Sequence, residues 1–111
     1  MSLFQIDSGR EWRGGQRQCL YLAKELETRG LPFTFVVQPE SPLHQKASES
    51  GLPIFPLRIK SEFDLRAIFR LCWAMKRHKC LLAHFHDAHS VAVGSAAASL
   101  AKVRYRVITR R

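Results

Sequence analysis

Strand-like and helix-like segments alternate along the whole chain, and this alternation constrains the fold more than any other feature. Short β-branched or aromatic runs predict five strands, over residues 2–7, 33–37, 52–57, 80–86 and 105–109. Helical spacing of apolar residues predicts four helices between them, over residues 15–29, 42–50, 63–78 and 88–101. Connections of a few residues and right-handed crossovers then dictate a parallel sheet covered on both faces. We predict an α/β, Rossmann-like, doubly wound fold with five strands in the order 3-2-1-4-5 and four helices.

The apolar positions of the last two helices indicate which sides are buried. Helix 63–78 is expected to bury five side chains: Leu65, Ile68, Phe69, Cys72 and Met75. Helix 88–101 is rich in small residues and is expected to pack closely through Ala92, Gly94 and Ala96.

Composition favours one folded domain with anionic partners. The 111 residues can bury one modest core, and no repeat or linker divides residues 1–111. A formal net charge of +9 favours nucleotide phosphates, nucleic acid or an acidic membrane surface without choosing among them. We find no nucleic-acid-binding motif, and therefore expect no nucleic-acid partner.

Cysteine usage and hydropathy point to the cytoplasm. Three cysteines without a C-x-x-C pair suggest reduced thiols in a cytosolic protein. No apolar run approaches the roughly 18 residues of a membrane span, and the first residues lack the layout of a signal peptide.

Two unusual stretches are expected to meet at one end of the sheet. In this fold, ligands bind outside the carboxyl ends of the strands where the strand order reverses, here between the first and fourth strands. That rule brings Gly14 and Gly15 beside residues 84–89. A strand that leads through glycines into a helix can hold an anion on free backbone N–H groups. The spacing is not G-x-G-x-x-G, and a plain tight turn explains the glycines equally well.

Residues 84–89 (HFHDAH) form the densest polar cluster of the chain. A metal site is one interpretation, but the spacing fits no standard zinc pattern, and Asp87 is equally well explained as a helix N-cap. We therefore expect no bound metal. His86 is the candidate for contacting a substrate sugar or stabilising charge, whereas His84 is interpreted as a core histidine.

Basic side chains give two further candidate contacts. Arg10, Arg13 and Arg17 surround the glycines and could meet phosphate, although for any single one of them a solvated surface position is the favoured interpretation. A second set lies on the outer face of helix 63–78 and consists of Arg66, Arg70, Trp73 and Arg77. This set suits an anionic membrane interface, and an ordinary charged helix face is an equal alternative.

Several of these motifs together resemble the opening of family 4 (group 1) glycosyltransferases. The similarity begins with residues 7–18 (DSGREWRGGQRQ), LAKEL at 22–26 and Arg29-Gly30. It continues through QPESPL at 38–43, GLPI at 51–54, HFHDAH at 84–89 and TRR at 109–111. The resemblance covers essentially the whole chain, in order.

The resemblance implies a GT-B fold, in which two Rossmann-like domains face each other across a cleft. The chain then corresponds to the N-terminal, acceptor-side domain of a retaining, metal-independent enzyme with no cofactor beyond its nucleotide-sugar donor. By this likeness, Gly14 and Gly15 approach the donor diphosphate, His86 lies near the transferred sugar, and Asp87 acts beside it as cap or sugar contact. The resemblance also implies a glycan or glycolipid acceptor, as in the synthesis of lipopolysaccharide or another envelope glycan. The enzyme would act on the cytoplasmic face of the membrane.

The family's C-terminal, donor-binding domain with its E-x7-E signature is absent from these residues. We therefore expect a truncated N-terminal half that transfers no sugar alone. One alternative is a non-catalytic, nucleotide- or anion-binding Rossmann-like partner subunit. Another is a basic RNA- or membrane-binding domain without a small-molecule site.

Overall fold

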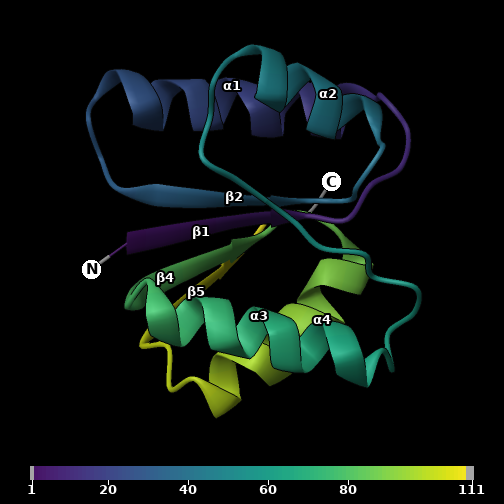
Figure 1. Cartoon of the computed structure of the whole chain (residues 1–111), viewed down its shortest axis with the longest axis vertical. Helices are drawn as coiled ribbons and strands as arrows, with labels where there is room; N and C mark the ends of the chain where they lie inside the picture. The colour runs from purple at the N-terminus through teal and green to yellow at the C-terminus, as the bar shows by residue number, and fades with distance from the viewer. Residues whose placement is uncertain (1, 110–111) are drawn as a thin grey trace.

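Five strands and four helices alternate in the computed structural model, which describes residues 2–109 (Figure 1). The strands are β1 (Ser2–Asp7), β2 (Phe33–Val37), β3 (Ile54–Pro56), β4 (Cys80–Phe85) and β5 (Tyr105–Ile108). The helices are α1 (Gly14–Thr28), α2 (Pro42–Glu49), α3 (Leu65–Arg77) and α4 (Ala88–Leu100). The TRR motif of the family resemblance ends at Arg110 and Arg111, which lie outside the described residues.

All neighbouring strands pair in parallel, in the order β3-β2-β1-β4-β5. Helices α1 and α2 cover one face of the sheet, and α3 and α4 cover the other (Figure 1). The predicted α/β, Rossmann-like fold and its strand order are therefore confirmed.

Side chains of the central strands contribute to two separate hydrophobic cores, one on each face of the sheet. Phe4 and Ile6 of β1 pack with α3 and α4, and Phe35 and Val37 of β2 pack with α1 and α2. Strand residues separated by one position point to opposite faces, so Gln5 and Asp7 of β1 lie on the α1 side. That side carries the polar network described below.

The buried side of α3 differs from the prediction. Leu65 and Phe69 are 65% and 62% exposed. The buried residues are Ala67, Ile68, Leu71, Cys72, Ala74 and Met75. With 3.6 residues per turn, the buried residues lie on one side of α3, and Leu65, Phe69 and Trp73 lie on another. Ala67 and Ala74 are buried in the core, whereas the large apolar side chain of Phe69, on which the prediction relied, is exposed.

The contact between α4 and β4 is very close at a single glycine. A Cβ added to Gly94 would lie 2.4 Å from the Phe85 ring, closer than atoms can approach. Val93, Ala97 and Ala98 are buried with it. The predicted contacts Ala92 and Ala96 are only half-buried, because the stripe that faces the sheet is shifted by one residue along the helix.

None of the helices in residues 2–109 combines the length and apolar character needed to cross a bilayer. Cys19, Cys72 and Cys80 carry free thiols, and burial raises the pKa of Cys80 to about 12. Cys19 and Cys72 are buried and Cys80 is half-buried.

Candidate functional site

A crevice of about 500 Å³ opens at the carboxyl ends of the strands. Its walls come from the β1–α1 loop, the segment before α3 and the start of α4. The residues that line it are Ser8, Gly9, Arg10, Glu11, Arg13, Gln16, Lys60, Asp87 and His89. The glycine loop and the histidine segment, far apart in the sequence, thus meet as predicted.

A direct side-chain contact joins these two segments. The backbone N–H of Ser8 donates to Asp87 Oδ1 at 2.9 Å, and the Ser8 hydroxyl donates to Asp87 Oδ2. Asp87 is also the N-cap residue of α4, and its own N–H donates to Ser90 Oγ at 3.2 Å. The carboxylate therefore fixes the end of β1 against the start of α4.

A second network shapes the loop between β1 and α1. The buried Asp7 accepts the Gly9 N–H at 2.8 Å and Gln16 Nε2 at 3.3 Å through Oδ1. Gln16 Oε1 accepts the Arg13 N–H at 3.1 Å. A Cβ at Gly9 would lie 2.2 Å from Gln16 Nε2, so the loop needs glycine there to keep this network.

Helix α1 begins at Gly14, with Arg13 as its N-cap residue and no acidic side chain in its first turn. Gly14 is exposed, and a Cβ added to it would meet nothing within 4 Å. The partial positive charge of a helix N-terminus is therefore accessible from outside at this point. The protein itself does not require glycine here, which leaves close approach of a ligand as a reason for it.

His86 lies at the same junction but is more enclosed than the sequence suggests. It is 5% exposed, and its Nε2 lies 2.6 Å from Oε1 of Gln5 on the neighbouring β1. The His84 and His86 rings lie 4.0 Å apart between centroids, and His84 Nε2 contacts Thr109 Oγ1. Both rings also line a small cavity of about 240 Å³ with Gly15 and Thr109. The half-buried, hydrogen-bonded His84 fits its interpretation as a core histidine.

The arginines around the loop occupy different positions. Arg13 lines the crevice and pairs with Glu11, with 2.5 Å between Arg13 Nη2 and Glu11 Oε2, while both side chains stay mostly exposed. Arg17 is exposed on the next turn of α1. Arg10 Nη2 donates to the Ile59 carbonyl at 3.4 Å, which links the loop to the segment before α3. Arg13 is thus better placed than Arg17 to meet a ligand in the crevice.

Sequence reasoning missed three polar residues that line the crevice, Ser8, Gln16 and Lys60, and it missed Gln5, which contacts His86. Gln5 could have been suspected, because a polar residue within a central, buried parallel strand is unusual. Nothing in the local sequence marks Lys60. Within residues 2–109, no group of three or more His, Cys, Asp and Glu side chains is arranged to hold a metal ion.

No protein-family model matches the sequence, and no curated protein matches it significantly. Solved structures do match. MurG of Acinetobacter baumannii superposes with a TM-score of 0.78 at 18% identity, over 96% of this chain and 34% of that one. Anabaena Alr3699/HepE in complex with UDP-glucose superposes with a TM-score of 0.76 at 12% identity, over 95% of this chain and 28% of that one.

These likenesses show the fold. The same Anabaena protein in complex with UDP and glucose gives a TM-score of 0.75. The chain spans about one third or less of the length of the structures it matches, so it corresponds to one Rossmann-like part of each.

Proposed function

We propose that the chain is the N-terminal, acceptor-side part of a GT-B glycosyltransferase that transfers a sugar from a nucleotide-sugar donor. The observation that carries the proposal is the meeting of the α1 N-terminus with the His86–Asp87 segment at the carboxyl ends of the strands: Arg13 and Asp87 line the crevice, and Gly15 and His86 line the small cavity. The same fold occurs in a protein solved with UDP-glucose, which supports a nucleotide-sugar as the ligand. The resemblance to family 4 (group 1) glycosyltransferases supports a retaining, metal-independent transfer.

The residues at the α1 N-terminus and in the His86–Asp87 segment have distinct roles in this proposal. The backbone N–H groups of Gly14 and Gly15 approach the donor diphosphate, where the helix dipole favours negative charge. Arg13 and Arg17 add cationic side chains, which bind phosphate oxygens through charge-assisted hydrogen bonds. His86 lies beside the transferred sugar in an orientation that Gln5 fixes, and Asp87 holds the α4 start in place.

The outer face of α3 supplies the membrane contact of this proposal. Arg66, Arg70, Trp73 and Arg77 are all exposed, and the Arg77 guanidinium lies 5.4 Å from the Trp73 ring centroid. Cations beside an exposed tryptophan favour an anionic bilayer surface. Peripheral attachment to the cytoplasmic membrane face suits synthesis of lipopolysaccharide or another envelope glycan.

Titration of the 111-residue protein with UDP-glucose, followed by amide NMR, tests the donor site. We expect weak, saturable shifts at Gly14, Gly15 and His86 in the wild type. The variant Arg106→Gln removes a positive charge on β5 and should give the same shifts as the wild type. Shifts spread over all basic surfaces, or absent from Gly14 and Gly15, would contradict the proposed donor contact.

The same titration separates an alternative class of function. A donor site shared between two domains is incomplete in these residues, so the proposal requires weak affinity. Tight, saturable binding of UDP would instead indicate a complete nucleotide site, as in a non-catalytic nucleotide-binding module.

A further inference from the structure

Acidic and basic side chains share the lining of the crevice, but the acidic ones are already engaged. The Glu11 carboxylate forms the ion pair with Arg13 described above. Both carboxylate oxygens of Asp87 accept hydrogen bonds from Ser8. The two carboxylates of the lining are therefore bonded to groups other than its remaining cations.

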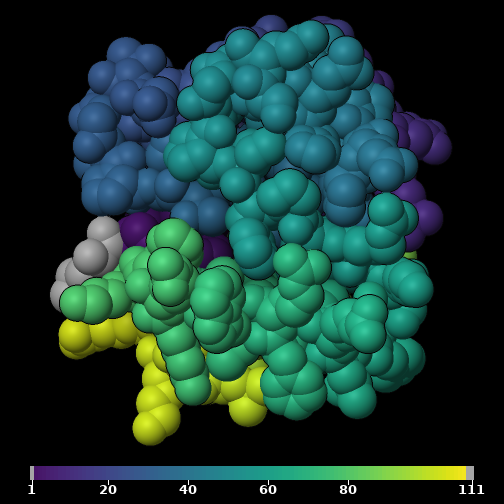
Figure 2. All heavy atoms as spheres, in the orientation of Figure 1, coloured from purple at the N-terminus to yellow at the C-terminus, as the bar shows by residue number. Residues whose placement is uncertain are grey.

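Arg10 and Lys60 are these remaining cations. Both side chains are exposed, and within residues 2–109 neither takes part in an ion pair. Arg10 comes from the loop between β1 and α1, and Lys60 comes from the segment between β3 and α3. Figure 2 shows this loop, in purple, beside this segment, in teal, at the right-hand edge of the molecule. Two walls of the crevice thus each contribute a cation that can meet an anionic ligand.

The Ile59 carbonyl holds these two cations next to each other. Arg10 Nη2 donates to this carbonyl at 3.4 Å, and Lys60 is the next residue along the chain. A guanidinium carries several N–H groups in one plane, so the bond to Ile59 leaves others for a ligand. Arg10 and Lys60 can therefore contact the same anionic group.

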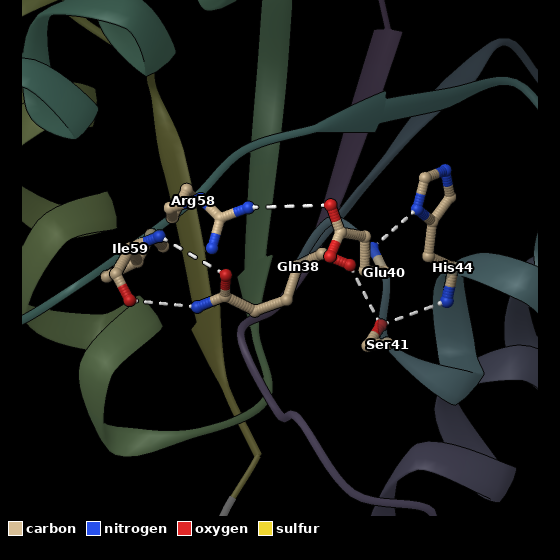
Figure 3. Close-up of polar contacts among 6 residues, drawn as sticks. All are labelled: Gln38, Glu40, Ser41, His44, Arg58 and Ile59. Atoms are coloured by element: carbon tan, nitrogen blue, oxygen red, sulfur yellow. Dashed lines mark hydrogen bonds and ion pairs between the residues drawn. The ribbon is translucent and has the colours of Figure 1, made fainter.

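A buried side chain fixes the backbone at Ile59 (Figure 3). Gln38 Nε2 donates to the Ile59 carbonyl at 2.8 Å, and Gln38 Oε1 accepts the Ile59 N–H at 3.4 Å. Gln38 follows β2 directly, so these bonds attach the segment before α3 to the end of a central strand. The carbonyl that Gln38 holds is the one that Arg10 contacts. Gln38 is therefore a positioning residue for both cations.

Arg58, on the other side of Ile59, has a different partner. Its Nη2 lies 3.9 Å from Glu40 Oε1 (Figure 3), and the lining of the crevice does not include it. Arg58 and Lys60 thus belong to one segment under the same bonds from Gln38, but only Lys60 lines the crevice. Arg58 is for this reason the matched control for Lys60.

The charge of the crevice selects the kind of anion. Three cations and two carboxylates line it, which leaves one net positive charge when histidine is counted as neutral. A carboxylate carries one negative charge, and its two oxygens fit the planar fork of a guanidinium. A phosphate monoester carries about 1.5 to 2 negative charges and would make the occupied crevice net negative. The neutral polar side chains Ser8 and Gln16 in the lining can bond the hydroxyls of a sugar.

We propose that Arg10 and Lys60 bind the carboxylate of an acidic sugar, such as a uronic acid, in the acceptor. This inference rests on the proposed function, because it names the acceptor class of the acceptor-side half. The site differs from the donor contact at Gly14 and Gly15, which do not line the crevice. It also differs from the membrane contact, which lies on the outer face of α3.

Amide NMR titrations of the 111-residue protein with methyl glucuronide and methyl glucoside test the proposal. The two probes differ only in a carboxylate in place of a hydroxymethyl group. At about 0.15 M salt, which screens exposed charges, the glucuronide should bind at least about fivefold more tightly and shift the Gly9, Arg10 and Lys60 amides. Equal affinity for the glucoside would overturn recognition of the carboxylate. Equal affinity for acetate would overturn the sugar site, and tighter binding of glucose 6-phosphate would overturn the choice of a carboxylate.

Charge-matched variants test the location. Lys60→Gln and Arg10→Gln should each weaken binding of methyl glucuronide about fivefold and change binding of methyl glucoside less than about twofold. The control Arg58→Gln removes the same charge from the same segment and should change either affinity less than about twofold. Equal losses in Lys60→Gln and Arg58→Gln would show general attraction to a basic surface and reject the site.

The positioning role of Gln38 has its own readout, the ratio of the two affinities. Gln38→Ala should lower the preference for methyl glucuronide over methyl glucoside, with the circular dichroism spectrum retained. A loss of both affinities by the same factor would reject the positioning role. UDP-glucose shifts at Gly14 and Gly15, recorded on the wild type, report the proposed function independently. Their presence without binding of methyl glucuronide would reject the acceptor inference alone.

Discussion

Helices α1 and α4 both begin at the crevice, but their first residues are built in opposite ways. The α4 start carries an acidic N-cap residue, Asp87, whose carboxylate is hydrogen-bonded to Ser8. The α1 start carries a basic N-cap residue, Arg13, followed by exposed Gly14. The Asp87 carboxylate thus already occupies the α4 start. At the α1 start, the N-cap residue Arg13 is cationic and no side chain covers Gly14.

This difference indicates which of the two helix N-termini can bind an anionic ligand. Negative charge near a helix N-terminus is stabilising, and at α4 the Asp87 carboxylate already provides it. An incoming anion would be repelled by that carboxylate and attracted at α1. The crevice therefore combines a helix start that carries its own carboxylate with one whose first turn holds no acidic side chain and whose N-cap residue, Arg13, pairs with the exposed Glu11.

The largest effect on stability is expected where α4 packs against β4. Gly94→Ala places a methyl group 2.4 Å from the Phe85 ring, so the helix or the ring must move. We expect a loss of about 2 kcal/mol in the free energy of unfolding, the usual cost of overpacking a core. Urea denaturation measures it. A stability change near zero would show that α4 is not held by close packing against β4.

The next effect tests the α4 start directly. Asp87→Ala removes the acceptor for the Ser8 N–H and hydroxyl, and should cost about 1.5 kcal/mol of unfolding free energy. Ser8→Ala is the matched variant, because it removes the hydroxyl and keeps the backbone bond. It should cost less than Asp87→Ala. Equal costs would mean that the backbone bond contributes nothing.

Asp64, the N-cap of α3, extends the comparison to a cap outside the crevice. Its carboxylate accepts the Ala67 N–H at 3.1 Å, and Asp64→Ala should cost about 1 kcal/mol near pH 7. The folded pKa is lowered, so this stabilisation is present above the unfolded pKa and is lost as pH falls through the folded pKa. Urea denaturation from pH 6 to pH 2 should therefore bring the Asp64→Ala variant and the wild type together at the acidic end.

The smallest effect on stability is expected at the α1 start. Gly14→Ala adds a methyl group to open space, so the unfolding free energy should change by less than about 0.5 kcal/mol. If the glycine serves ligand approach, the same variant should weaken UDP-glucose binding several-fold in the NMR titration. Unchanged binding would leave Gly14 without a ligand role and would make the two helix starts functionally alike.

Local patterns were sufficient to predict the elements and the strand order. Each strand is a short β-branched or aromatic run, and each helix has its own cap or apolar stripe. The handedness of β-α-β crossovers then leaves few arrangements. The buried side of α3 was predicted wrongly in part, because Leu65 and Phe69 follow a helical spacing of their own.

The crevice was predicted at the level of segments but not of contacts. Topology brings residue 14 near residue 86, whatever the side chains are. The bonds from Ser8 to Asp87 and from Gln38 to Ile59 depend on the final placement of elements 79 and 21 residues apart. For the same reason the enclosure of His86 by Gln5 of the adjacent strand could not be read from the residues around His86.

The bond between Ser8 and Asp87 also sets when the crevice can form during synthesis. Strands β1, β2 and β3 lie on one side of the sheet, so a nascent chain can pair them early. The partner of Ser8 leaves the ribosome only after α3 and β4 have been made. The crevice is therefore among the last features of the domain to assemble, and a chain stopped before residue 87 would have the glycine loop without its opposite wall.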